Sequence, residues 1–170
     1  MNQTVDINAL NDDQLCAYLM ALLSETLPDL IIKGGADEPF YEAPTDDSKG
    51  ILYFRSNYPR SLLHELSHYC LAGARRRELD DFGYWYIPTG RNADEQARFE
   101  SVEARPQGLE KAMCHALGIQ FSPSLDDFSG RPASKEFLEE LETVYQEMLT
   151  SPPPTASKVL EALSRPMSRS

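Results

Sequence analysis

The segment 61–70 reads Ser-Leu-Leu-His-Glu-Leu-Ser-His-Tyr-Cys and contains the pattern His-Glu-x-x-His. On a helix, His64 and His68 lie about one turn apart and share a face. That spacing allows two imidazoles to bind one metal ion. At about 100° per residue, an apolar group lies on the opposite face. This group comprises Leu62, Leu63, Leu66, Tyr69 and Cys70. The sequence therefore predicts a buried helix that carries a metal site.

A chance match is the alternative, because the pattern has only three fixed positions. The chain has three histidines in all, His64, His68 and His115, and two of them flank this glutamate in register. Glu65 is the only acidic or basic residue between Arg60 and Arg75. A helix this apolar is buried, and a buried histidine pair needs a polar partner. These observations favour a metal site over a pair of core histidines.

Length and charge limit the class of protein. The chain has 170 residues, the size of one domain, and its formal net charge is -11. Nucleic-acid binding would need a basic face, so we expect no such partner. The three cysteines, Cys16, Cys70 and Cys114, lie in apolar helical contexts and indicate reduced core thiols. The polar N-terminus and the lack of a long apolar run predict a cytoplasmic protein without a membrane partner. We expect a monomer.

Apolar periodicity predicts a mostly helical α+β fold. Two β-like runs, 30–32 and 51–54, predict a small antiparallel sheet beside the metal helix. A helix that begins near Asn92 is predicted to break at Pro106 and to resume over 107–117. We expect one metal-dependent domain over 1–150, followed over 151–170 by a proline-rich linker, a short helix and a tail.

A carboxylate on the second helix can complete the metal site. Glu100 and Glu103 are three residues apart and share a face, and Phe99 and Val102 mark the neighbouring buried side. Two histidines and one carboxylate leave open metal positions. Zinc held in this way can activate water for peptide hydrolysis, with Glu65 as the base. Iron(II) held in this way forms the facial triad of non-haem oxygenases. Spacing and composition leave both chemistries open.

Several short blocks, in one order between residues 30 and 131, together resemble the bacterial elongation factor P hydroxylase family. The blocks are Lys33-Gly34, Asp37-Glu38-Pro39, His64 to Cys70, Arg76 to Leu79, Asp81 to Tyr86, Gly90-Arg91, Phe99 to Glu103 and Pro106-Gln107. The chain departs from the family pattern at Thr89, where aspartate is expected before Gly-Arg.

The resemblance implies a hydroxylase that acts on the lysine of elongation factor P that already carries a β-lysyl group. It also implies a fold similar to zinc metallopeptidases, here called zincin-like, and not the double-stranded β-helix of 2-oxoglutarate oxygenases. By the same resemblance the metal is Fe(II), with zinc possible in purified protein. O₂ is the co-substrate, and no 2-oxoglutarate site is evident. The ligands implied are His64, His68 and a glutamate of the Phe-Glu-x-Val-Glu segment.

We choose Glu103 as the third ligand, because it lies in the last turn before Pro106, where the chain is predicted to bend. Glu100 is then expected to accept a hydrogen bond from a histidine N–H. Glu65 is expected to orient bound water or a substrate amine, since oxygen insertion needs no such base.

A β-lysylated lysine presents cationic amines on a long arm, which requires carboxylates and an apolar or aromatic wall. Candidates for these contacts are Asp37, Glu38, Asp81, Tyr84 and Trp85. The alternative is that the aspartates cap turns and that the aromatic residues are core.

Three functions follow as hypotheses. The first is the iron-dependent hydroxylase, the second is a zinc metallopeptidase, and the third is a non-catalytic interaction module stabilised by metal. The three consecutive arginines Arg75, Arg76 and Arg77 are either a solvated cluster at a helix end or a contact for an acidic protein.

Overall fold

The structure is a computed structural model that describes residues 4–84, 91–125 and 132–167. Its elements combine helices with a three-stranded sheet, so the fold is α+β and mostly helical. In chain order they are η1 (Ile7–Ala9), α1 (Asp12–Thr26), β1 (Leu30–Ala36), β2 (Phe40–Glu42), β3 (Gly50–Arg55), α2 (Pro59–Leu71), α3 (Ala74–Arg77), η2 (Asp80–Gly83), α4 (Ala93–Leu117), α5 (Lys135–Thr150) and α6 (Pro154–Ser164).

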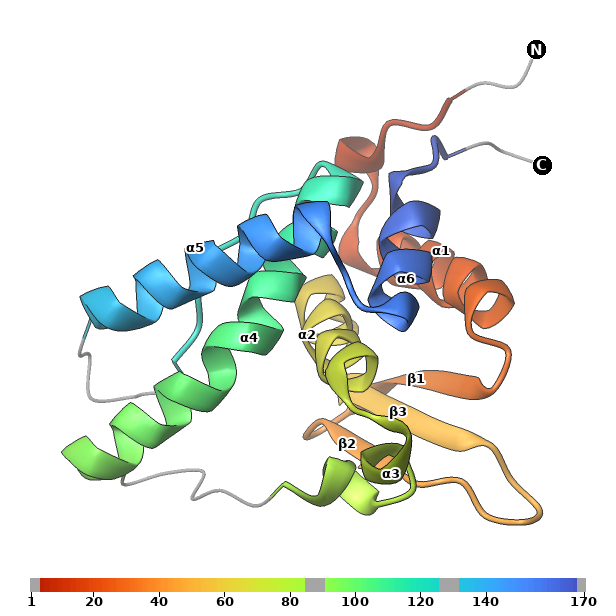
Figure 1. The fold of residues 1–170 in the computed structure, drawn as a ribbon. Coiled ribbons are helices and arrows are strands. Elements are labelled where there is room, and N and C mark those ends of the chain that lie inside the picture. The colour runs from red at the N-terminus through yellow and green to blue at the C-terminus, as the bar shows by residue number, and fades with distance from the viewer. Residues whose placement is uncertain (1–3, 85–90, 126–131, 168–170) are drawn as a thin grey trace.

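Helix α2 lies at the centre of the molecule (Figure 1). It contacts β3 on one side and α4 on another, while α5 packs along α4. Helices α1 and α6 contact each other, α1 also contacts β1, and α6 also contacts α2 and α4. The apolar face predicted for α2 is confirmed, because Leu62, Leu63 and Leu66 are fully buried. The opposite face of α2 is thereby left for its two histidines.

The sheet is mixed, and the prediction of an antiparallel sheet was wrong for one of its two pairings. The strand order is β1-β3-β2, with β1 parallel to β3 and β2 antiparallel to β3. The most apolar strand, β3, takes the central position, where Leu52 and Phe54 are fully buried. The chain reverses direction between β1 and β2 and again between β2 and β3, so β3 runs in the direction of β1.

Helix α4 continues through Pro106, so the predicted break at this residue was wrong. Proline removes one intrahelical hydrogen bond, and the cost is offset by packing along this helix. Pro106 itself is buried, and α4 packs against both α2 and α5. The helix is also well terminated, since Asn92 forms a capping box with Glu95 and Gly118 adopts a left-handed φ of 77°. Glu103 and the residues beyond Pro106 therefore share one continuous helix.

The C-terminal helix α6 belongs to the main core. Ala156, Val159 and Leu163 are buried in the same apolar cluster as the buried faces of α1 and α2. The backbone N–H of Val5 donates to the carbonyl of Met167 at 3.0 Å, so the two ends of the described chain lie side by side (Figure 1). No helix in the described ranges is long and apolar enough to cross a membrane.

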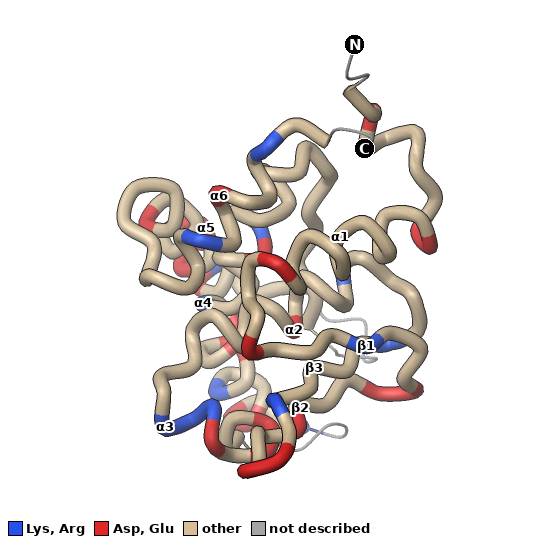
Figure 2. The backbone as a smooth tube through the Cα atoms, turned by 90° about the vertical axis from the view of Figure 1, so that its right-hand side faces the viewer, with Lys and Arg blue, Asp and Glu red and all other residues tan. Residues whose placement is uncertain are grey.

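Charge and thiols follow simple patterns. Acidic positions are spread over many elements, whereas the basic positions of α3 lie next to one another (Figure 2).

Cys16, Cys70 and Cys114 are free and buried. Burial raises the pKa of Cys70 and of Cys114 to about 12, so both remain protonated thiols at neutral pH.

Candidate metal centre

The two histidines of α2 lie on one face of this helix, as their spacing predicts. His64 and His68 are both partly buried, and their Nε2 atoms are 3.2 Å apart. Their rings meet edge to face, with centroids 4.9 Å apart. Both Nε2 lone pairs can therefore be directed to one point.

Glu103 of α4 reaches the same point. Its Oε2 lies 3.3 Å from His64 Nε2 and its Oε1 lies 3.1 Å from His68 Nε2. One donor atom from each of these three residues can be chosen so that all lie within 4.8 Å of one another, a group that could hold a metal ion. Two helices that are far apart in the sequence thus bring the three side chains together.

The separations of the donor atoms suit ligands of one ion. With metal–ligand bonds of about 2.1 Å, ligands at right angles lie about 3.0 Å apart and tetrahedral ligands about 3.4 Å apart. Ligands on opposite sides of the ion would lie about 4.2 Å apart. The two histidine Nε2 atoms are 3.2 Å apart, and each lies 3.1 to 3.3 Å from a different oxygen of Glu103, which is the range expected for adjacent ligands of one ion. The nitrogen and oxygen donor set suits both zinc and iron.

The electrostatics of the cluster favour a cation. Burial alone would lower the pKa of His64, but the carboxylates of Glu103, Glu110 and Glu65 raise it to about 10. Burial would raise the pKa of Glu103, but the two histidines and a hydrogen bond from Gln107 lower it to about 2. Glu103 is therefore a carboxylate at neutral pH. The surroundings that stabilise a proton on His64 would equally stabilise a metal cation.

Glu110 is hydrogen-bonded to Nδ1 of His64, the ring nitrogen that does not contact Glu103. The sequence did not reveal this role. Its Oε1 lies 2.9 Å from His64 Nδ1, and its Oε2 accepts hydrogen bonds from Arg60 of α2. An imidazole that donates Nδ1–H to a carboxylate presents its Nε2 lone pair to a metal. Glu100, predicted for this role, instead accepts a hydrogen bond from Ser134 at 2.7 Å.

Gln107 holds Glu103 in a similar way. Its Nε2 lies 3.2 Å from Glu103 Oε2 and also donates to the carbonyl of Ser124. Glu103, Gln107 and Glu110 follow one another at i, i+4 and i+7, the spacing of one helix face. That pattern could have been found in the sequence, but the break assigned to Pro106 concealed it.

Glu65, the acidic residue of the motif, lies beside this cluster. Burial raises its pKa, the two histidines lower it, and the neighbouring charges of Glu103 and Asp81 raise it again. In the described part of the chain no group donates a hydrogen bond to the Glu65 carboxylate.

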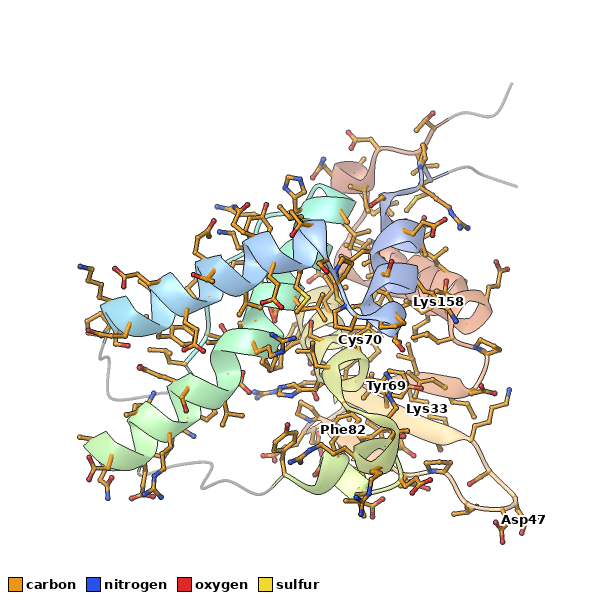
Figure 3. The ribbon with its side chains drawn as sticks, viewed as in Figure 1. Lys33, Asp47, Tyr69, Cys70, Phe82 and Lys158 are labelled. Atoms are coloured by element: carbon orange, nitrogen blue, oxygen red, sulfur yellow. The ribbon has the colours of Figure 1, made fainter. Side chains whose placement is uncertain are left out.

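Asp81 lies in a strained turn next to α3. Asp81 and Phe82 have φ values of 47° and 59°, in the left-handed region that costs about 1–2 kcal/mol per residue. The turn is held because Asp81 accepts a hydrogen bond from the N–H of Tyr41 and because Phe82 stacks on the Tyr41 ring at 4.3 Å. Figure 3 shows Phe82 next to Tyr69 of α2. In this position the charge of Asp81 is close enough to raise the pKa of Glu65.

The other predicted substrate residues have varied positions. Asp37 and Glu38 are exposed between β1 and β2. Tyr84 is half-exposed, with the guanidinium of Arg76 4.3 Å from its ring centroid. Trp85 lies outside the described residues.

Two of the three consecutive arginines make contacts within the molecule. Arg76 donates to the carbonyl of Phe82. Arg77 donates to the carbonyl of Tyr69 and to the hydroxyl of Thr155. The side chains of Arg76 and Arg77 are therefore engaged within the molecule. This leaves fewer free guanidinium groups for an acidic partner than the sequence suggested.

Fold and site together define an α+β protein with two histidines and one carboxylate, on helices α2 and α4, that could hold a metal ion. Residues 20–169 match the elongation factor P hydroxylase family, and the chain belongs to this family. It is also 39% identical, over 119 residues, to a protein of Haemophilus influenzae (strain ATCC 51907 / DSM 11121 / KW20 / Rd) named elongation factor P lysine hydroxylase. The match covers 69% of this chain and 65%, just under two thirds, of that protein.

Proposed function

We infer that the protein is a non-haem iron(II) hydroxylase that acts on the β-lysylated lysine of elongation factor P, the final step of that modification. The observation that carries the proposal is the cluster of His64, His68 and Glu103, whose donor atoms lie within 4.8 Å of one another, in a chain of the elongation factor P hydroxylase family. Iron(II) bound there would supply O₂ activation at its free positions. A zincin-like fold agrees with the position of the His-Glu-x-x-His pattern on helix α2 beside the sheet.

The chain's own residues hold the metal-binding side chains in place and orient the substrate. Glu110 and Gln107 fix the donor atoms of His64 and Glu103. Glu65 and Asp81 supply two carboxylates beside the site, and burial raises the pKa of both. A substrate ammonium group would relieve this cost, since a nearby positive charge favours the ionised carboxylates. We assign Glu65 and Asp81 to the orientation of a cationic substrate arm.

A zinc metallopeptidase is the second candidate, because Glu65 occupies the position of a general base within the His-Glu-x-x-His pattern. The two candidates differ in metal and in product. Zinc in the active protein, together with cleavage of a peptide, would favour the peptidase.

Mass spectrometry of elongation factor P from cells with and without this protein tests the proposal directly. We expect the modified lysine to lose the mass of one oxygen atom when the protein is absent. Cells that carry His64→Ala should match the cells without it. An unchanged mass at this lysine would contradict the proposal.

The role assigned to Asp81 makes a separate prediction. Asp81→Asn should retain its metal and lower hydroxylation of elongation factor P, because the amide keeps the hydrogen bond from Tyr41 but lacks the charge. Glu38→Ala, on the exposed connection between β1 and β2, should likewise retain its metal and lower hydroxylation if this carboxylate also recognises the cationic arm. If both variants hydroxylate at the wild-type rate with their metal content intact, these carboxylates do not recognise a cation.

A further inference from the structure

Two polar side chains link the metal-site residues to one stretch of irregular chain. This stretch is the 119–125 segment, which follows α4. Arg60 donates to the carbonyl oxygens of Gln120 and Ser122, at 3.5 and 2.9 Å. Gln107 donates to the carbonyl of Ser124 and accepts from its N–H at 3.0 Å. The segment is thus held from α2 and from α4 at once.

Each of these two side chains is also connected, directly or through one carboxylate, to a different candidate metal-donor residue. Arg60 pairs with Glu110, which contacts His64 Nδ1 at 2.9 Å. Gln107 contacts Glu103 Oε2 directly, at 3.2 Å. Two of the three donor residues therefore have a hydrogen-bonded path to the 119–125 segment, and the two paths share no residue.

Burial makes both paths sensitive to small displacements. Glu110 is 3% exposed and Gln107 is 1% exposed. A buried polar group that loses a hydrogen bond costs about 1–3 kcal/mol, more if it is charged. The 119–125 segment cannot shift without breaking bonds at these residues, and the donor side chains cannot rotate without the same loss.

We propose that Gln107, and Arg60 acting through Glu110, are positioning residues that couple metal occupancy to the conformation of the 119–125 segment. The inference rests on the proposed metal centre. A bound metal fixes the rotamers of His64 and Glu103. These two side chains fix Glu110 and Gln107. Arg60, through Glu110, and Gln107 in turn hold the 119–125 segment. The linkage is reciprocal. The factor by which bound metal favours the ordered segment equals the factor by which an ordered segment raises metal affinity.

Hydrogen exchange on the full chain tests the coupling, with anaerobic iron(II) as the metal. We expect iron to slow exchange of the 119–125 amides roughly tenfold in the wild type. The double variant Arg60→Met, Gln107→Met should lose most of this slowing, and its iron dissociation constant should rise roughly 10–100-fold. The matched control is Arg105→Met, Gln146→Met, which removes the same groups from the exposed contacts with Glu147 and Glu142. The control should behave as the wild type.

The outcomes separate this inference from the proposed function. A wild-type protein that binds iron with no change in exchange over 119–125 refutes the coupling and leaves the metal centre intact. A wild-type protein that binds no iron refutes both. If the double variant unfolds, Arg60→Lys replaces it, because lysine can neutralise Glu110 but cannot also hold two carbonyl groups. An undiminished iron effect in Arg60→Lys would exclude the path through Arg60.

Discussion

At the scale of single residues, position on a helix face decides which of two similar carboxylates meets the histidines. Glu100 and Glu103 are neighbours on α4, yet Glu103 is 5% exposed between the histidines and Glu100 bonds to Ser134. A difference of three residues turns the side chain by about 60° around the helix axis. That rotation separates a residue of the candidate metal site from one that contacts the start of α5.

This difference predicts a clear result for two matched substitutions. Glu103→Gln keeps the side-chain shape but removes the charge, so we expect the metal dissociation constant to rise more than about tenfold. Glu100→Gln should bind metal as the wild type does, since its amide oxygen can still accept from Ser134. Metal titration of the two purified variants checks this. The reverse ranking would mean that Glu100 is the ligand.

The sequence predicted the candidate donor residues, whereas the residues that hold them were found only in the structure. His64 and His68 follow from spacing alone, because a helix brings i and i+4 together. Glu103 could be selected only with the help of a bend at Pro106 that the structure does not have. Arg60 and Glu110 are 50 residues apart in the chain, so their pairing depends on how α2 and α4 pack and has no local signal.

At the scale of elements, tertiary packing overrides local preference twice. The proline in α4 and the parallel pairing of β1 with β3 both oppose the expectation from short sequence windows. Pro106 is buried within α4, and the buried strand β3 occupies the centre of the sheet, where it pairs with both β1 and β2. Apolar periodicity did locate α2 and the start of α4, because it reports burial directly.

The close contact of α4 with α5 depends on Gly108. A Cβ atom at this position would lie 2.6 Å from Val144 Cγ1 and 3.0 Å from the carbonyl oxygen of Leu141. Gly108→Ala should therefore destabilise the protein by about 1–3 kcal/mol through overpacking. The gain in helix propensity, about 1 kcal/mol, offsets only part of this.

Urea unfolding compares this variant with Gly73→Ala as a control. Gly73 has a φ of -71° and nothing within 4 Å of a Cβ, so its substitution should change the free energy of unfolding by less than about 0.5 kcal/mol. Equal stability of the two variants would show that α5 can move away from α4 at little cost.

At the scale of the whole molecule, the candidate metal site depends on a core that includes the C-terminal helix α6. Helix α6 contacts α1, α2 and α4, and so it supports both helices that carry the donor residues. Its side chains Ala156, Val159 and Leu163 are at most 3% exposed. The proline-rich stretch before α6 leads back into the core, and the last described residues pair with the N-terminal segment through Val5.

A truncation after Thr150 should therefore abolish both cooperative unfolding and metal binding. Each large apolar side chain removed from the core forfeits about 1.5–3 kcal/mol, and the partner surfaces on α1 and α4 become exposed as well. The total is comparable with the whole stability of a typical domain, about 5–15 kcal/mol. Truncation after Arg165 is the control, because it leaves α6 complete. Thermal unfolding followed by circular dichroism, with metal content measured on the same samples, distinguishes the two chains. A truncated 1–150 chain that melts cooperatively near the wild-type temperature and retains its metal would show that α2 and α4 hold the site without α6.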